Sequence, residues 1–446
     1  MKKTIFLSAL ALAAAAYAIP EIREGSVTMV QEKDRTVTIG YTLDNAPAVV
    51  TLEICTNGVP LTGALLRGKV SGDINRKVEP GPHVLTWRPS DDERIAGDRR
   101  WCEAAQAKVT AWPTNAPPTW MVVDLTDGSL DFYADKSWFP LPLTDDLYKT
   151  DKLVMRKVPA ANVVTRIGSP NPVGNGSYQE YGRIGDGNTP CERPHPVMLT
   201  EDFYIGIYEF TQGQWKHLPN RTVKCGQGQC QSATNDVCPI ANVRVKQELR
   251  NGSNSAYVSL WPRDGHYVDP TSALGQLRTV AKGAVEFDLP TDAQWEIACR
   301  ACCPFAFNNG CNDYEDADGV EEVAWTSANA SEGVAWAQVH PVGSKTPNAW
   351  DLYDMHGNVL EYTLDMVTHG GTNDYANATT LQVDPVGPPY AYNMPGAETG
   401  AEYCVGRGGS FQSNPVDCRA AKRFANYRWS SGVINGFRVA CPAVIK

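Results

Sequence analysis

The sequence has no surplus of basic residues and, after its first twenty residues, no long apolar run. Its 40 lysines and arginines are outnumbered by 50 aspartates and glutamates, which gives a net charge of -10, and the basic residues are scattered along the chain. We therefore expect no nucleic-acid partner, because phosphate binding needs a concentrated basic surface. We also expect no membrane span, because no later stretch is long and apolar enough to cross a bilayer.

Several catalytic patterns are missing as well. The seven histidines form no H-E-x-x-H pattern, no G-x-S-x-G elbow surrounds Ser410, and no G-K-[ST] follows Gly174 and Gly176. A zinc protease, an α/β-hydrolase and a P-loop nucleotide site therefore lack support in the sequence. No repeat period is visible, so a repeat array is not expected.

The first eighteen residues carry the three-part pattern of a secretory signal peptide. Lys2 and Lys3 precede an apolar run at 5–16, and Ala16-Tyr17-Ala18 provides a small-x-small cleavage site. We therefore predict that residues 1–18 are a signal peptide and that the protein is exported, either periplasmic or secreted. All 13 cysteines follow this segment. In an oxidising compartment disulfide bonds are their default use, and the odd number leaves at least one thiol over.

Two groups of cysteines are close in sequence. They are Cys225, Cys230 and Cys238, and Cys302, Cys303 and Cys311. Zinc sites usually show paired short spacings with supporting histidines, and these spacings are irregular. Export favours bridges over zinc for both groups, with zinc as the alternative.

Residues 19–112 are predicted to form an all-β domain. Short segments that alternate apolar and polar residues are separated by turn residues such as Asn57-Gly58 and Pro80-Gly81-Pro82. This spacing predicts a β-sandwich of immunoglobulin-like size, stapled by Cys55 and Cys102. Residues 113–147 are predicted to be a linker, within which 120–125 fits one further strand.

The second domain, 148–446, shows the same helix start signal twice. Thr211 is followed three residues later by Gln214, and Thr291 by Gln294, so each pair can close a capping box. Apparent strands at 203–210 and 285–290 precede these helices. The mixture predicts an α+β domain.

A series of motifs runs through this domain. In chain order they are Lys152-Leu153-Val154-Met155-Arg156, Tyr204-Ile205-Gly206, Thr211 to Trp215, Leu289 to Glu296, Asn348 to Val359, Arg407-Gly408-Gly409-Ser410 and Gly436-Phe437-Arg438. Together they resemble the formylglycine-generating enzyme (sulfatase-modifying factor) family. The resemblance covers residues 148–446. It implies a compact, loop-rich variant of the C-type lectin fold with a groove near the carboxyl terminus.

The resemblance also implies an oxidase chemistry that this sequence cannot complete as written. Family enzymes oxidise a cysteine of a sulfatase to formylglycine with a Cu(I) ion held by C-x-x-x-x-C. Here the second position is Cys418, but the first is Ser413. Soft Cu(I) prefers thiolates, so we do not expect copper. Cys418 could instead be the free thiol, a small buried side chain or half of a disulfide with Cys299.

The family's calcium site carries over more fully. The resemblance implies side-chain ligands at Asp354 and Glu361 and main-chain carbonyl ligands at Gly357 and Val359. Such hard oxygen ligands suit Ca²⁺. The alternative is a turn with solvated acids.

These observations favour a non-catalytic binding or interaction module over an enzyme. The candidate ligand surface is the segment after the Arg-Gly-Gly-Ser motif, with polar, charged and aromatic side chains that suit an extracellular peptide or glycan, or another exported protein. Its candidate residues are Ser413, Asn414, Asp417, Lys422, Arg423, Asn426, Tyr427 and Trp429. Burial of Tyr427 and Trp429 in the core is the alternative. The alternative function is a formylglycine-generating or related metal-dependent oxidase, with Cys418 as its catalytic residue.

Overall fold

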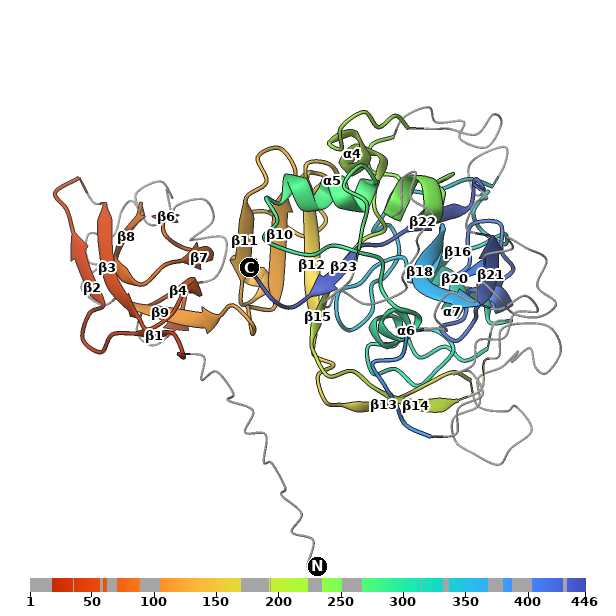
Figure 1. Cartoon of the computed structure of the whole chain (residues 1–446), viewed down its shortest axis with the longest axis horizontal. Helices are drawn as coiled ribbons and strands as arrows, with labels where there is room; N and C mark the ends of the chain where they lie inside the picture. The colour runs from red at the N-terminus through yellow and green to blue at the C-terminus, as the bar shows by residue number, and fades with distance from the viewer. Residues whose placement is uncertain are drawn as a thin grey trace, which may run out of the picture. The chain divides into compact units, whose positions relative to one another are not determined.

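The computed structural model describes residues 18–34, 36–56, 59–61, 70–88, 105–169, 192, 194–223, 235–250, 267–313, 315–331, 337–367, 380–386, 403–427 and 431–446. The chain divides into two units, Met1–Thr114 and Asn115–Lys446. Figure 1 shows both units. Among the described residues, no helix combines the length and the apolar character that a bilayer crossing requires.

Unit 1 consists of two antiparallel sheets in its described part. The first joins β1 (Glu21–Ile22), β3 (Val37–Asp44), β8 (Gly81–Trp87) and β6 (Val70–Gly72), with β2 (Thr28–Gln31) also paired to β3. The second joins β5 (Val59–Pro60), β4 (Ala48–Thr56) and β7 (Arg76–Val78), with β9 (Ala105–Pro113) also paired to β4.

The strand β3 shows why this unit is a β domain. Its residues alternate between buried and half-buried positions, and the buried set includes Val37, Ile39 and Leu43. Successive side chains of a strand point to opposite faces, so the alternation gives the sheet one apolar face. The predicted short strands are confirmed. The immunoglobulin-like assignment stays a prediction, as does the staple to Cys102, which lies outside the described residues.

The predicted linker is wrong over much of its length. Residues 120–133 form β10 (Trp120–Asp124) and β11 (Leu130–Tyr133), and β10 pairs with both β11 and β12 (Lys152–Val158). This sheet continues through β15 (Phe203–Gly206) to β23 (Ala440–Pro442), so it joins the start and the end of unit 2. The strand at 120–125 was recognisable from its apolar run, but its partners lie later in the chain.

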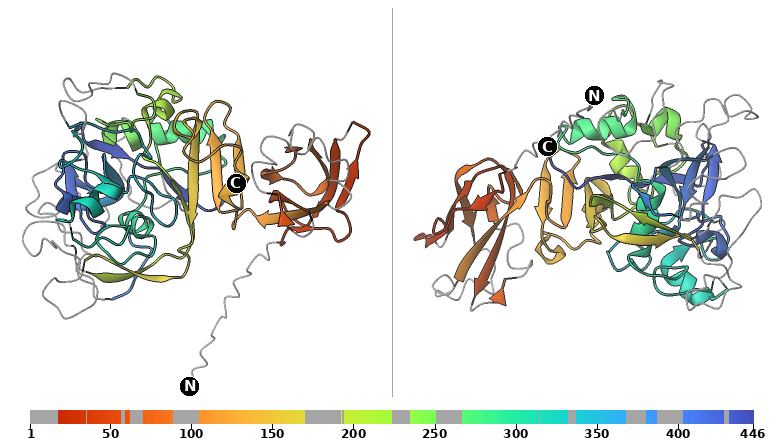
Figure 2. Two further views of the ribbon diagram at one scale, coloured as in Figure 1. Left: turned by 180° about the vertical axis from the view of Figure 1, so that it is seen from behind. Right: turned by 60° about the horizontal axis from the view of Figure 1, so that its bottom comes forward.

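A second sheet of unit 2 carries the Arg-Gly-Gly-Ser motif at its end. Its order is β21 (Phe424–Tyr427), β20 (Tyr403–Arg407), β18 (Leu360–Val367) and β22 (Asn435–Phe437). Figures 1 and 2 show the two sheets at opposite sides of the unit. Smaller pairings join β13 (Val164–Ile167), β14 (His195–Met198) and β19 (Gln382–Val383), and β16 (Ala324–Trp325) with β17 (His356–Gly357).

The described helices are short. They are α3 (Leu147–Thr150), α4 (Gln212–Lys216), α5 (Ala273–Val280), α6 (Asp292–Arg300) and α7 (Ala317–Val323), with a π-helical turn, η3 (Val245–Arg250), and 3₁₀ turns, η2 (Lys136–Trp138) and η5 (Pro415–Cys418). The structure is thus a mixed, sheet-rich one with few helices.

Both predicted capping boxes are confirmed. Thr211 accepts from the amide of Gln214 and Thr291 from that of Gln294, while each glutamine side chain accepts from the threonine amide. The expected strand at 285–290 is wrong, since only one bridge, Asp288 to Ala440, forms there.

Helix α6 connects the two main sheets. Trp295 and Ile297 belong to the same buried cluster as Trp120, Val154 and Ile205 of the first sheet. The same helix also packs against β18 and β20 of the second sheet. All nine of its residues are buried, which makes α6 the base on which the carboxyl-terminal motifs are assembled.

Candidate functional site

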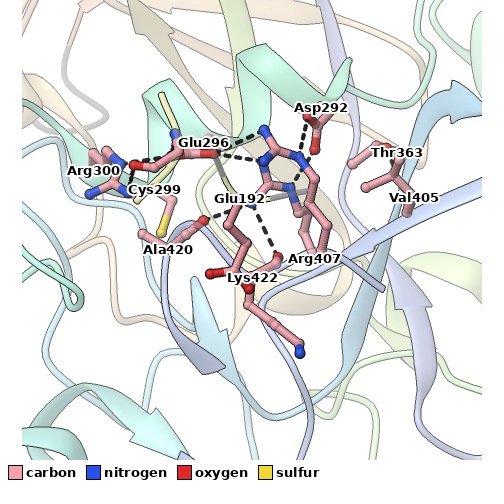
Figure 3. Close-up of polar contacts among 12 residues, drawn as sticks. Glu192, Asp292, Glu296, Cys299, Arg300, Thr363, Val405, Arg407, Ala420 and Lys422 are labelled. Carbon is pink, nitrogen blue, oxygen red and sulfur yellow. Dashed lines mark hydrogen bonds and ion pairs between the residues drawn. The ribbon is translucent and has the colours of Figure 1, made fainter. Parts of the chain in front are cut away.

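Arg407 closes the loop that contains the copper-motif positions. Its Nε donates to Asp292 Oδ1 at 2.5 Å and its Nη2 to Glu296 Oε2 at 2.7 Å, so α6 holds the guanidinium (Figure 3). Its Nη1 donates to the carbonyl oxygens of Ala420, at 2.7 Å, and Lys422, at 3.2 Å. One side chain therefore joins the helix, the beginning of the 408–422 loop and its end.

Arg423 completes this ion network and does not line a surface groove. It is 1% exposed, and its Nε donates to Asp292 Oδ2 at 2.8 Å. Arg300 donates to Glu296 Oε1 at 2.9 Å from the next turn of α6. The predicted ligand role of Arg423 is therefore wrong, because its charge is used inside the protein.

The arginines determine the charge of the two acids. Burial raises the pKa of Asp292, but Arg407 and Arg423 outweigh burial and leave it below the ordinary value. Burial also raises the pKa of Glu296, and Arg300, Arg407 and Arg423 hold it well below its usual range. Both carboxylates are charged at neutral pH, as buried ion pairs must be if they are to be stable.

Two glycines and two serines shape the start of the 408–422 loop. Gly408 and Gly409 have positive φ angles of 82° and 73°, and a Cβ on Gly409 would lie 2.6 Å from Cys418 Sγ. The Ser410 amide donates to Ser413 Oγ at 3.0 Å, and the two hydroxyl oxygens are 3.1 Å apart. Ser413 therefore uses its hydroxyl within the turn.

Cys418 lies in an apolar setting. Its side chain is 0% exposed and clusters with Phe307, Val320 and Val323, among other apolar residues. Burial, then the negative charge of Asp417, raises the pKa of the thiol to about 12. At neutral pH the sulfur is a protonated thiol, which matches the alternative of a small buried side chain.

The disulfide considered between Cys418 and Cys299 is not present in the structure, where both thiols are free. Cys299 Sγ instead lies 3.6 Å from His356 Nε2. That nitrogen accepts from the Asn308 amide at 3.1 Å, so the ring proton sits on Nδ1 and is donated to the Cys418 carbonyl at 2.7 Å. Burial lowers the pKa of His356 to about 4, consistent with a neutral ring.

The exposed part of the loop is its tip. Gln412 and Asn414 are exposed, and Ser413 and Asp417 are half-buried. Asp417 pairs with Lys422 at 3.1 Å, although Lys422 is itself largely buried. The remaining candidates are not brought to this tip by any described contact: Asn426 is half-buried on β21, and the side chain of Tyr427 and all of Trp429 lie outside the described residues.

The predicted calcium loop is tightly built. Asp354, Gly357 and Asn358 have positive φ angles of 55°, 77° and 56°, and a Cβ on Gly357 would lie 2.0 Å from the Trp325 carbonyl oxygen. Asp354 Oδ2 accepts from the Gly343 amide at 2.6 Å, whereas its Oδ1 is buried with no hydrogen-bond partner. Burial raises the pKa of Asp354 to about 6.

Glu361 is engaged in a different contact. Arg438 Nη2 donates to its Oε1 at 2.8 Å, and Trp295 Nε1 donates to its Oε2 at 2.7 Å. Glu209 is a third buried acid nearby, whose pKa burial and then Asp354 raise well above the ordinary value. Its Oε1 accepts from the Val359 amide at 2.9 Å and its Oε2 from Asn358 Nδ2 at 2.6 Å.

These residues fit a calcium ion in part. Three buried acids face Arg438, and the unpartnered Asp354 Oδ1 is the kind of hard oxygen that Ca²⁺ binds. Glu361 does not fit as a ligand while Arg438 and Trp295 occupy its oxygens. The described residues contain no group of three or more His, Cys, Asp or Glu that is arranged to hold a metal. The calcium site thus stays a prediction that depends on Asp354.

Glu209 is the residue of this cluster that the motifs did not single out. It is an acid inside the otherwise apolar run 203–210, and a buried charge in such a run needs partners. That signal was available in the sequence. The roles of Asp292 and Arg407 were not, because each partner lies more than a hundred residues away.

The chain is similar to several known proteins. A family model described as "Sulfatase-modifying factor enzyme 1-like domain" matches residues 172–443. The chaperone protein LppX of Paenibacillus barcinonensis is 28% identical over 197 residues, which are 39% of this chain and 66% of that protein. The formylglycine-generating enzyme of Thermomonospora curvata is 32% identical over 166 residues, which are 34% of this chain and 48% of the enzyme.

Among solved structures, the Treponema denticola variable protein 1 matches with a TM-score of 0.43 and 22% identity, over 65% of this chain and 95% of its own. This chain spans at most 66% of the length of the two relatives named above. The family model, in contrast, covers more than half of the chain. The chain therefore belongs to the family of proteins with a sulfatase-modifying factor enzyme 1-like domain.

Proposed function

We propose that this protein is an exported, non-catalytic member of the family, which binds an extracellular peptide or glycan through the tip of the 408–422 loop. In this proposal unit 2 is the loop-rich variant of the C-type lectin fold and unit 1 is an immunoglobulin-like sandwich. The observation that carries the proposal is that neither Ser413 nor Cys418, the two positions of the copper motif, offers a thiolate. Cys418 is buried as a protonated thiol, and Ser413 bonds to Ser410.

The residues present do not fit the family's copper ion. Cu(I) favours soft thiolates, and a serine hydroxyl is a hard oxygen that stays protonated at neutral pH. The one thiol of the motif lies among Phe307, Val320 and Val323, and Gly409 packs directly on its sulfur. Copper-dependent oxidation is therefore not the chemistry that this loop supports.

The loop is better suited to recognition. Its tip presents two exposed amides, Gln412 and Asn414, next to the half-buried Ser413 and Asp417. These groups offer donors and acceptors with little net charge, since Asp417 is paired with Lys422. Such a surface can bind the hydroxyls of a glycan or the main chain of a peptide.

Rigidity of the loop supports the same interpretation. Arg407 ties its two ends together, and the Ser327 amide donates to the Ser413 carbonyl at 2.9 Å. The Phe411 amide donates to the Asn358 carbonyl at 2.8 Å. A tip that is ordered before binding loses less conformational entropy when the ligand binds. A small polar surface can therefore still reach a measurable affinity.

The family does not by itself imply an oxidase. One relative is named a chaperone protein and another a formylglycine-generating enzyme. The formylglycine-generating relative is the observation that favours the alternative function, an oxidase for sulfatase maturation.

Binding and copper loading test the proposal together. Purified protein is screened against glycan and peptide arrays, and the strongest ligand is titrated against Gln412→Ala and Asn414→Ala, with Lys216→Ala on α4 as a control remote in sequence. We expect each tip variant to weaken binding by about 1–2 kcal/mol, as loss of a hydrogen bond does, and the control to bind normally. In parallel, protein loaded anaerobically with Cu(I) is assayed on a cysteine-bearing sulfatase-motif peptide. Tight stoichiometric copper with aldehyde formation would establish the oxidase instead.

A further inference from the structure

Two Asn-Gly pairs of the sequence lie in the described part of the chain, and they differ in exposure. Asn309 and Gly310 are both exposed, in the segment between α6 and α7. Asn435 and Gly436 are both buried, in the strand β22. The same dipeptide therefore stands in two opposite environments. The remaining Asn-Gly pairs, which lie outside the described residues, begin at Asn57, Asn175 and Asn251.

An Asn-Gly pair can lose ammonia without an enzyme. The main-chain nitrogen of the glycine loses its proton and attacks the Cγ atom of the asparagine, a cyclic imide forms, and the side-chain nitrogen leaves as ammonia. Water then opens the imide at either carbonyl, which gives aspartate or isoaspartate. No electrons are exchanged, and water is the co-reactant. Glycine favours the attack because it has no Cβ to crowd the approaching backbone.

The turn at Asn309 leaves room for this attack. Gly310 has a φ of 93°, and apart from its chain neighbours the described atom nearest to its Cβ position is Phe305 Cδ2, at 4.0 Å. The Gly310 amide donates to the Phe307 carbonyl at 3.2 Å, at the long end of the usual range. Asn309 Oδ1 accepts from the Cys311 amide at 3.1 Å, so the side chain is folded back over the main chain that must attack it.

The second pair is closely packed. Asn435 is 7% exposed, and its Nδ2 donates to the Tyr362 hydroxyl at 2.8 Å. A Cβ on Gly436 would lie 2.5 Å from Val359 Cγ2. The strand β22 also pairs with β18, which fixes its main chain. Ring closure at Asn435 therefore requires this part of the sheet to open first.

We propose that Asn309 is a site of spontaneous deamidation and that the new carboxylate loosens α7. Asn309 Nδ2 donates to the Gly319 carbonyl at 2.8 Å and to Glu322 Oε2 at 2.8 Å. After the reaction both acceptors face a carboxylate oxygen, which has no proton to donate and repels the charge of Glu322. Isoaspartate also carries the main chain through the former side chain, so the contact with the Cys311 amide is lost.

Helix α7 transmits this change to the candidate site. Val320 and Val323 belong to the same apolar cluster as Phe307 and Cys418. The Asn309 side chain adds a polar connection between this helix and the preceding turn. Its loss therefore weakens the packing around Cys418 from the helix side. The reaction at Asn309 does not depend on the proposed function, since it needs neither a ligand nor a metal.

Peptide mapping of the folded full chain tests the site. The protein is incubated in water enriched in oxygen-18, digested and analysed by mass spectrometry. We expect labelled aspartate and isoaspartate at position 309, formed faster at alkaline than at neutral pH because the attacking nitrogen must lose its proton. Position 435 is the internal control, and its reaction should be slower by on the order of tenfold or more, since a buried segment reacts only when it opens locally.

Unfolding removes the difference between the two positions. In protein unfolded by guanidinium, positions 309 and 435 should become labelled at similar rates. Absence of label at 309 in the folded protein, or equal labelling of the two positions there, would overturn the proposal.

Two variants separate the reaction from its consequence. Asn309→Gln keeps an amide donor but forms the larger imide ring far more slowly, so it should stay unlabelled. Asn309→Asp introduces the product carboxylate directly. Hydrogen exchange at the α7 amides should be faster in Asn309→Asp than in Asn309→Gln by about twofold to tenfold, the range that loss of one hydrogen bond gives. Equal exchange in the two variants would refute the loosening of α7.

Discussion

Replacement of Arg407 by methionine is the sharpest test of how the carboxyl-terminal motifs work. Methionine keeps much of the length and apolar volume of arginine but makes none of its hydrogen bonds. The variant loses the pairs to Asp292 and Glu296 and both bonds to the carbonyl oxygens of Ala420 and Lys422. Asp292 and Glu296 then stay fully buried with only Arg300 and Arg423 as ion-pair partners among the contacts described above.

The expected cost follows from burial. Removing one partner of a buried ion pair destabilises a protein by about 3–5 kcal/mol, because a charge is left without compensation. We expect a loss in that range, and not the sum of four separate bonds, because the contacts form one network and their energies are not additive. Lys216→Ala is the control, since its partner Asp236 is 45% exposed and exposed pairs contribute about 0–1 kcal/mol.

The assay is equilibrium unfolding in urea, followed by tryptophan fluorescence and by far-UV circular dichroism. The two units of the chain can unfold in separate transitions. The free energy of unfolding is therefore taken from the transition that both signals assign to unit 2. Hydrogen exchange then shows whether the amides of 408–422 become exposed. If Arg407→Met costs no more than Lys216→Ala, the network does not hold the loop and the reasoning fails.

Four further results are expected. Arginines hold the pKa of Glu296 well below its usual range despite its burial. Charged Glu296 therefore stabilises the folded protein fully above the ordinary glutamate pKa of about 4.3, and this stabilisation is lost as pH falls through the folded pKa. Urea titrations at several pH values should show the loss in the wild type, and Glu296→Gln should lack this part of the pH dependence. Gly357→Ala should destabilise by about 2 kcal/mol or more, since its Cβ would meet the Trp325 carbonyl in a left-handed backbone; a stability equal to wild type would contradict this. Cys418 should resist alkylation in the native protein at pH 8 and react on unfolding, as peptide mapping would detect. Calcium added after chelation should raise the unfolding midpoint in wild type but not in Asp354→Asn, and an equal response in both would remove Asp354 as a ligand.

Local signals in the sequence predicted local structure well. The threonine and glutamine of each capping box are three residues apart, so the spacing alone contains the interaction. The alternating segments of unit 1 likewise predicted strands, since period-two burial is a property of the strand itself. What the sequence could not show is which strands pair. For this reason the sequence predicts a linker at 113–147 with a single strand at 120–125, although β10 and β11 share a sheet with β12.

The candidate site was predicted less well, because its key residues are charged and fully buried. Charged side chains are rarely buried unless paired, so the sequence predicts a surface position for Arg423. Its partner Asp292 lies 131 residues earlier in the chain. Nothing in the spacing indicates that pairing, whereas the family motifs do mark both α6 and the end of β20 as important.

A serine can occupy position 413 because the contacts that shape the 408–422 loop do not depend on a copper ligand there. The 408–422 loop is held by Arg407 from α6, by the close approach that Gly409 allows and by the turn that Ser413 itself makes with Ser410. None of these contacts needs a thiolate. A serine at this position therefore leaves the form of the loop intact, with the side chains of Gln412 and Asn414 exposed at its tip.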